Sequence, residues 1–330
     1  MATNNLNFFY KSTLYNLNKI MLLISLIFIY LILILFTILI SRNLELYDQP
    51  NIRKIHKTKT LNTGGVSIYI FYLIIVYFFE FNHNIELIIA IGFFVCLVGL
   101  IDDKINLNPS TKITFTVIPS VYLILNGITL PNLGSYEYIE AINLGKFQIP
   151  FLILASGLLI NATNYIDGID GLLLTFFGCC LGYYIFLIED TKTIYLIKIL
   201  LIPVIINLIL NMLQSKSKLK IFSGNSGSLF IGFFISFLTI NFYKDFDIHP
   251  VYLIWPLWYP VYDFLFVSTN RFIKKKSIFN ADNSHLHHIF FKKFKKNHFK
   301  TVLLFFVSNI LIIYFGFIVS DFSKILSLLT

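Results

Sequence analysis

The sequence is poor in charge and has no long polar segment outside a few loops. Charged residues form 13% of its 330 residues and hydrophobic residues 57%, against about 25% and about 45–50% in an ordinary soluble domain. Met21 to Ile40 carries no charge, and about 20 such residues span a bilayer. That run is too long for a secretory signal, and no small-residue cleavage site follows it. The composition excludes a soluble protein and predicts a membrane protein.

Cysteine is scarce, and internal repeats and low-complexity linkers are absent. Cys96, Cys179 and Cys180 lie in apolar stretches without metal-ligand spacing, which indicates small core residues with no redox role. With no soluble domain between the apolar runs, we expect one membrane-embedded domain over residues 1–330.

The apolar runs predict an all-α polytopic membrane bundle of about ten transmembrane helices. Their expected limits are 20–41, 65–81, 85–101, 113–130, 150–163, 171–188, 194–213, 227–242, 250–270 and 301–320.

The basic residues predict the orientation of this bundle. The net charge is +9, but the basic residues sit in short loops between spans, which disfavours a nucleic-acid partner. Counted by alternate loops, one side holds 19 Lys and Arg residues and the other six. The positive-inside rule assigns the richer side to the cytoplasm and both termini to the outside.

Polar motifs gather in the loops and span ends on the predicted cytoplasmic side. Asp102 and Asp103 end one span. Carboxylates inside a bilayer are costly, so they either mark the water boundary, bind a divalent cation or act as a base.

The next motif runs from Asn161 through Asn164 and Asp167 to Asp170. Its four polar side chains recur at every third residue, which keeps neighbours close on one helical stripe. A simple exit loop does not need this order, so the spacing favours a binding site.

Three further segments fit anionic ligands, each with a structural alternative. Residues 222–228 put glycines and serines before a helix, where backbone N–H groups bind anions or a serine caps the helix. His285, His287 and His288 precede several lysines; they suit phosphates better than zinc, although a basic interfacial helix is the alternative. Residues 48–57 carry positive charges and lead to a glycine pair, which suits a diphosphate. The positive-inside rule alone would also place these charges here.

In order along the chain, these segments resemble the polyprenyl-phosphate N-acetylhexosamine-1-phosphate transferase family. The matching motifs are Asp48-x-Pro-Asn-x-Arg-Lys-x-His, Gly64-Gly, Gly99-Leu-Ile-Asp-Asp, Asn161-x-x-Asn-x-x-Asp-Gly-Ile-Asp-Gly, Gly224-x-Ser-Gly-Ser and His285-x-His-His. The spaced histidines look more like the initiators of O-antigen and teichoic-acid linkage synthesis than the related peptidoglycan translocase.

The resemblance implies transfer of a sugar 1-phosphate from a UDP-N-acetylhexosamine to polyprenyl phosphate, with Mg²⁺, or alternatively Mn²⁺, as cofactor. It implies a bacterial inner (cytoplasmic) membrane protein whose site, formed by loops 42–63, 102–112, 161–171, 214–226 and 271–300, faces the cytoplasm; a homodimer is left open. The implied roles are catalysis by Asp102 and Asp103, metal binding by Asn225 and Asn164, nucleotide-sugar binding by Asn161, Asp167, Asp170, Lys57 and Arg53, and diphosphate or sugar binding by His285, His287, His288 and Arg271.

Two positions depart from the family pattern. The family usually has Asp where this chain has Asn225, and Arg where it has Asn283. An amide oxygen can bind Mg²⁺ but brings no charge. A catalytically impaired family member is therefore one alternative. A transporter is a second, which predicts mid-span charges and repeated halves.

Overall fold

The computed structural model describes residues 2–49, 58–214, 217–275 and 284–330, and this part of the chain is 77% helical. The all-α membrane class predicted from the sequence is confirmed. The α-helices are α1 (Ala2–Asn43), α2 (Gly64–Phe78), α3 (His83–Ile105), α4 (Pro109–Leu125), α5 (Gln148–Ile166), α6 (Leu172–Leu187), α7 (Thr191–Asn211), α8 (Gly224–Phe246), α9 (Pro250–Ile254), α10 (Trp258–Ile273), α11 (Leu286–Lys293), α12 (His298–Phe322) and α13 (Lys324–Leu329), with 3-10 turns η1 (Gly145–Phe147) and η2 (Trp255–Leu257).

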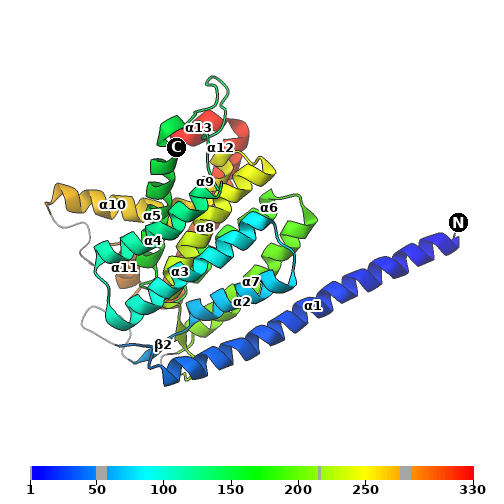
Figure 1. The fold of residues 1–330 in the computed structure, drawn as a ribbon, viewed down its shortest axis with the longest axis horizontal. Helices are drawn as coiled ribbons and strands as arrows, with labels where there is room; N and C mark the ends of the chain where they lie inside the picture. The colour runs from blue at the N-terminus through cyan, green and yellow to red at the C-terminus, as the bar shows by residue number, and fades with distance from the viewer. Residues whose placement is uncertain (1, 50–57, 215–216, 276–283) are drawn as a thin grey trace.

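Helix α8 lies at the centre of the bundle (Figure 1). Of its most apolar 18-residue window, 83% is buried, and it packs against α2, α3 and α5. Glycines allow these close approaches: a Cβ on Gly65 would lie 2.1 Å from the Cα of Gly227, and one on Gly99 would lie 2.4 Å from the Cα of Ser226. The backbones of α2 and α3 therefore meet α8 near its first turn.

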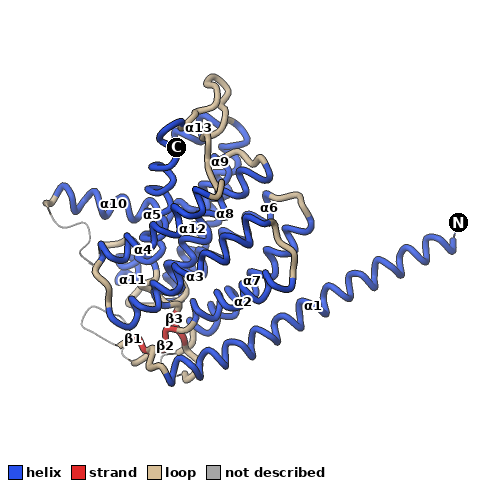
Figure 2. Tube along the Cα trace, in the orientation of Figure 1, coloured by secondary structure: helices blue, strands red, loops and turns tan. Residues whose placement is uncertain are grey.

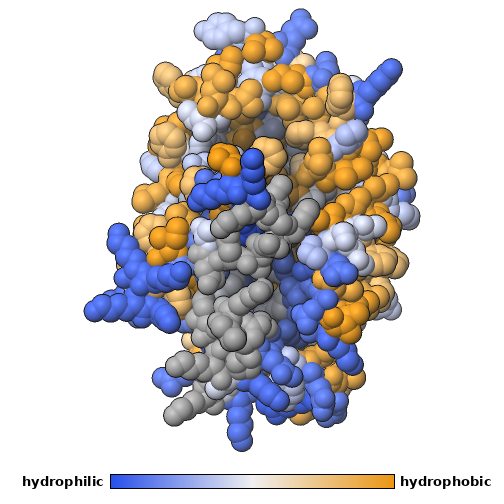
Figure 3. Space-filling model, turned by 90° about the vertical axis from the view of Figure 1, so that its left-hand side faces the viewer, coloured by the Kyte–Doolittle hydropathy of each residue, from blue (hydrophilic) through white to orange (hydrophobic). Residues whose placement is uncertain are grey.

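Six of the described helices are long and apolar enough to cross a membrane: the α1 segment from Lys19, α3, α5 with its preceding turn, α7, α8 and α12. The shorter α2 and α6 are also apolar. Hydrophobic residues cover the upper part of the face seen in Figure 3, and hydrophilic residues gather lower down. This distribution fits a multi-pass membrane protein.

The predicted span 250–270 is not one helix. Helix α9 ends at Ile254, the chain makes the turn η2, and α10 then runs out to the side of the bundle (Figure 1). Pro256 and Pro260 explain the break, because each removes a backbone donor and disturbs the preceding helical turn. Its consequence is that α10 approaches the histidine segment from the side.

A small sheet, which the sequence does not predict, joins two of the loops (Figure 2). Strand β1 (Tyr47–Asp48) pairs antiparallel with β2 (Thr60–Asn62), and β2 pairs parallel with β3 (Ile221–Phe222). It ties loop 42–63 to loop 214–226 directly before α2 and α8. We call this end of the bundle, with the C-terminus of α3 and the start of α8, the polar end.

Candidate active site

The last turn of α3 brings Asp103 against the first residues of α8. Its Oδ1 accepts the backbone N–H of Asn225 at 3.0 Å and the side-chain amide of Asn62 at 3.1 Å, and its Oδ2 accepts the backbone N–H of Ser226 at 3.4 Å. The first N–H groups of a helix lack partners within the helix and attract negative charge. An anion was expected at this helix start, and the carboxylate of Asp103 takes that place.

The neighbouring Asp102 is buried, at 4% exposure, and turns toward α4. Its Oδ2 lies 2.6 Å from Nζ of Lys112, and its Oδ1 accepts the backbone N–H of Leu107 at 2.8 Å. A carboxylate shielded from water needs such partners, because an unpaired buried charge is costly. The pairing of Lys112 with Asp102 was not predicted from the sequence, because Lys112 belongs to no motif.

Lys112 also links this ion pair to α5 and α8. Its Nζ donates to Oδ1 of Asn164 at 3.4 Å. Nδ2 of Asn164 donates in turn to Oδ1 of Asn225 at 2.7 Å and to Oγ of Ser228 at 2.8 Å. The two amides expected at a metal therefore lie together, with their oxygen atoms facing protein donors.

Two other members of the motif at the end of α5 lie outside this network. Asn161 donates to the carbonyl of Gly157 in its own helix at 2.7 Å. Asp170 pairs with Nζ of Lys220 at 2.5 Å and lies 3.6 Å from Nδ1 of His298. Lys220 and His298 were not predicted as site residues, because neither belongs to a motif.

Asp167 is the carboxylate of this motif that remains without a partner. It follows the last residue of α5 and is half-buried; among the described residues it has no hydrogen bond or ion pair. Burial raises its pKa well above the usual range, and the nearby carboxylates of Asp103, Asp170 and Asp48 raise it further. This crowding of negative charge suits a cation.

The three histidines lie at the start of α11, beside α10. Oδ2 of Asp263 lies 2.8 Å from Nδ1 of His285, and its Oδ1 accepts the backbone N–H of Leu286 at 2.7 Å. The hydroxyl of Tyr259 lies 2.9 Å from Nδ1 of His287. Burial lowers the pKa of His287 well below its usual range, and the neighbouring histidines lower it further.

The histidines also border the motif at the end of α5. A Cβ on Gly168 would lie 3.3 Å from Nε2 of His288 and 3.6 Å from Nε2 of His287. The ring of Tyr165 stacks on His285 with centroids 5.2 Å apart. The predicted gathering of separate motifs at one end of the bundle is therefore present in the structure.

The remaining predicted residues divide into two groups. Arg53 and Lys57 lie outside the described residues. Arg271 is buried in the last turn of α10, eight residues after Asp263. Asp263 was not predicted, although one signal for it existed: it is a carboxylate within a predicted span, and such residues usually have a function.

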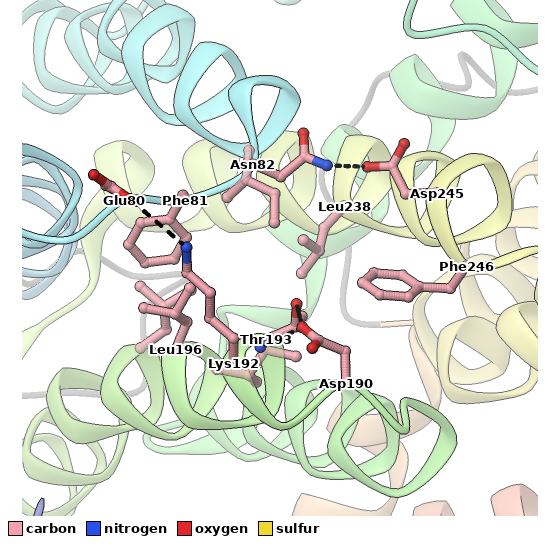
Figure 4. Close-up of a pocket in the computed structure, with 13 residues that line it drawn as sticks. Glu80, Phe81, Asn82, Asp190, Lys192, Thr193, Leu196, Leu238, Asp245 and Phe246 are labelled. Carbon is pink, nitrogen blue, oxygen red and sulfur yellow. Dashed lines mark hydrogen bonds and ion pairs between the residues drawn. The ribbon is translucent and has the colours of Figure 1, made fainter.

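A cavity of about 310 Å³ lies at the other end of α3 and α8 (Figure 4). Asn82 donates to Asp245 at 2.7 Å, Lys192 lies 3.9 Å from Glu80, and Asp190 caps the first turn of α7. Its polar rim is therefore engaged with the protein itself. This cavity contains none of the predicted site residues.

The protein is therefore a multi-pass membrane protein. Its candidate active site lies where the polar ends of several helices meet. Residues 85–243 match the profile of the family described as "Glycosyl transferase family 4". This stretch begins in α3, ends in α8 and includes the network from Asp102 to Asn225.

Named bacterial proteins are similar over most of the chain. An undecaprenyl-phosphate alpha-N-acetylglucosaminyl 1-phosphate transferase of Thermotoga maritima is 30% identical, over 80% of this chain and 78% of the relative. The protein of that name in Escherichia coli O157:H7 is 25% identical, over 81% and 75%. A probable undecaprenyl-phosphate N-acetylglucosaminyl 1-phosphate transferase of Bacillus subtilis is 27% identical, over 73% and 68%. The chain belongs to glycosyl transferase family 4.

The donor groups can be compared with the Mg²⁺ that the sequence resemblance implies. Mg²⁺ commonly binds one or two carboxylates and keeps water or substrate phosphates as further ligands. The described residues contain no cluster of three His, Cys, Asp or Glu side chains suited to a metal, and the oxygens of Asn164 and Asn225 face protein donors. The unpartnered Asp167 fits a cation better than the amide pair does.

Proposed function

We propose that this protein transfers a sugar 1-phosphate from a UDP-linked N-acetylhexosamine to polyprenyl phosphate, of the undecaprenyl type, and releases UMP. Family membership and the relatives' names support this reaction class. The observation that carries the proposal is the network Asp102–Lys112–Asn164–Asn225, which lies at the polar end with the unpartnered Asp167 and the histidines.

The chemistry needs little beyond positioning and charge neutralisation. A phosphate oxygen of the lipid attacks the β-phosphorus of the donor, a new P–O bond forms, and the bond to UMP breaks. One phosphoanhydride replaces another, and both reactants are anionic, so screening of charge dominates catalysis. Lys112 is partly exposed, at 17% of its side chain, and can meet an incoming phosphate while Asp102 holds it in place.

The two adjacent carboxylates have different roles in this proposal. Asp103 has both oxygens engaged by Asn225, Ser226 and Asn62, so it fixes the start of α8. Asp102, with Lys112 beside it, keeps the acceptor phosphate deprotonated, which is a modest task because the second pKa of a phosphate monoester is about 6.

Asp167 is the proposed anchor for Mg²⁺ or Mn²⁺. When bound, the cation would neutralise charge on the donor diphosphate. His287 and His288 lie beside Gly168, and in this proposal the three histidines supply further contacts to the diphosphate or sugar.

We further propose that the polar end faces the cytoplasm, in the inner membrane. The count of 19 against six basic residues supports this orientation, and it gives the site access to a soluble nucleotide-sugar. The lipid acceptor would enter from the bilayer.

The test is UMP release by the purified, detergent-solubilised chain. It receives undecaprenyl phosphate and a panel of UDP-N-acetylhexosamines, with Mg²⁺, Mn²⁺ or EDTA. We expect UMP only when lipid, donor and divalent cation are all present. Silence across the panel, alongside an active relative treated identically, would contradict the proposal.

A catalytically impaired relative is the second candidate, and one observation favours it. Asn225 stands where the family motif usually has a carboxylate, and its oxygen is occupied by Asn164. A chain that binds UDP but releases UMP only after Asn225→Asp would support this alternative.

A further inference from the structure

Two side chains of α10 each contact the Nδ1 atom of a histidine. Tyr259 and Asp263 are four residues apart, so they lie on one face of the helix, and both are buried. Asp263 contacts Nδ1 of His285 at 2.8 Å, and Tyr259 contacts Nδ1 of His287 at 2.9 Å. Helix α10 therefore holds Nδ1 of each imidazole, which we call the inner nitrogen; Nε2 is the outer nitrogen.

The outer nitrogens have no partner in the described part of the chain. Nε2 of His285 and Nε2 of His287 are both buried without a hydrogen bond, and the two rings are nearly parallel, 18° apart with centroids separated by 5.5 Å. Buried polar atoms are normally satisfied, so an exception calls for an explanation such as a missing ligand. Two aligned and unsatisfied nitrogens suggest a ligand with more than one polar atom.

The inner contacts determine which nitrogen carries a proton. A carboxylate can only accept, so Nδ1 of His285 bears a hydrogen. The hydroxyl of Tyr259 can donate to Nδ1 of His287, which leaves the ring proton on Nε2. Nε2 of His287 can then donate to an acceptor-only group, and Nε2 of His285 donates to such a group once its ring takes up a second proton from solvent as the anionic ligand binds.

We propose that Asp263 and Tyr259 are positioning residues that fix the protonation and orientation of His285 and His287, so that both Nε2 atoms donate to the diphosphate of the nucleotide-sugar. The inference rests on the proposed function for the identity of the ligand. Gly168 has no side chain, so the space in front of His287 and His288 stays clear. Gly168 directly follows Asp167 in the chain.

Asp263→Asn provides a sharp test, because the backbone fixes the direction of the new amide. Its oxygen is needed by the N–H of Leu286, so its NH₂ group faces His285. Exchanging the carboxylate of an Asp–His pair for an amide keeps the geometry but changes the tautomer. In the variant the ring hydrogen of His285 lies on Nε2, so the neutral ring donates to the diphosphate without a second proton.

The measurement is the affinity of the purified full chain for UDP in Mg²⁺ by titration calorimetry, which requires no turnover. We expect Asp263→Asn to weaken binding about 5- to 15-fold, because the Nε2 donor of His285 stays in place but loses its charge, and this is the usual difference between a charged and a neutral hydrogen bond. Tyr259→Phe should weaken it about 2- to 10-fold, the range for a neutral bond. Asp321→Asn, at an exposed position at the end of α12, is the matched control and should bind as the parent does.

The double variant separates positioning from a general structural defect. In a His285→Ala background, Asp263→Asn should cause a much smaller loss of UDP affinity than in the parent, because Asp263 acts mainly through that ring, at 2.8 Å, and only at 3.8 Å through His287. Equal losses in both backgrounds, or parental affinity in both single variants, would overturn the inference. Thermal unfolding of each variant shows whether it remains folded, and Asp263→Glu should recover part of the affinity.

UMP release separates this inference from the proposed reaction. A chain with the expected binding pattern that releases no UMP keeps the positioning role and overturns the transfer. Variants that release UMP at the parental kcat and KM keep the transfer and overturn the positioning role.

Discussion

At the scale of single residues, an acidic side chain in this site is defined by its partner. Asp103, Asp102 and Asp170 are held by the start of α8, by Lys112 and by Lys220, respectively. Asp167 is the member of this group without a partner among the described residues. The sequence shows four similar carboxylates, and only the fold distinguishes their environments.

The first residue-scale prediction concerns Asp102. We expect Asp102→Asn to reduce UMP release about 100-fold or more, the usual range for loss of acid–base function, while the Kd for UDP stays unchanged. The ion pair with Lys112 is lost, so the ammonium group of Lys112 is no longer held beside the acceptor phosphate. Steady-state UMP assays, with Asp321→Asn as control, measure the effect; a fully active variant would remove Asp102 from the mechanism.

A second residue-scale prediction concerns Asn225. Its side-chain oxygen lies 2.7 Å from Nδ2 of Asn164, so Asn225→Asp adds a carboxylate without a change of size. The added charge should lower the Mg²⁺ concentration needed for half-maximal activity, because carboxylates bind this ion better than amides. A metal titration of UMP release tests it, and an unchanged midpoint would place the cation away from position 225.

The ion pairs and hydrogen bonds of Asp102, Asp170 and Asp263 show which site residues could be predicted from the sequence. The motifs predicted which segments meet, because polar segments are costly inside the bilayer and therefore gather on the same membrane face. Lys112 and Asp263 were missed as site residues for different reasons. Lys112 resembles any other loop cation, and Asp263 lies in an apolar stretch whose proline break turns it toward the histidines.

At the scale of elements, α8 depends on the glycines of its neighbours. A Cβ on Gly65 would meet the backbone of Gly227 at 2.1 Å, and backbone cannot move aside as a flexible side chain can. The same contact seats the start of α8, whose N–H groups hold Asp103. Packing and site geometry are therefore coupled at this turn.

Gly65→Ala tests this coupling. We expect a loss of stability of about 1–3 kcal/mol, the usual cost of overpacking, and a loss of activity at temperatures where the variant is still folded. Gly182→Ala in α6 is the control, because a Cβ there meets nothing within 4 Å. Thermal unfolding in detergent compares the two, and equal melting temperatures would show that the helices can separate without cost.

The length of the spans predicted the helices, but not how they end. Prediction succeeds for α3, α7 and α8 because long apolar runs have few alternatives to a helix in a membrane. The sheet β1–β2–β3 was missed, since strands of two or three residues leave no periodic signal. The break at η2 could have been anticipated from the spacing of Pro256 and Pro260.

At the scale of the whole molecule, the two ends of the bundle differ in chemistry. The polar end gathers Asp102, Asp167 and the histidines, whereas the other end carries the loop before α5, where Glu137 accepts the backbone N–H of Lys324 at 2.6 Å. A reaction between a soluble nucleotide-sugar and a membrane lipid requires the polar end to face the compartment that makes the nucleotide-sugar. Orientation is therefore part of the functional argument.

Cysteine labelling from one side of the membrane tests that orientation. Lys104 at the polar end and Glu140 at the opposite end are both exposed, and Cys96, Cys179 and Cys180 can be replaced to leave a single thiol. In intact cells with a permeable outer envelope, an impermeant maleimide should label Glu140→Cys but not Lys104→Cys. Opening the inner membrane should make both thiols reactive. The reverse pattern would put the site outside the cytoplasm, where it would lack a UDP-sugar supply, and the proposed transfer would fail together with the orientation.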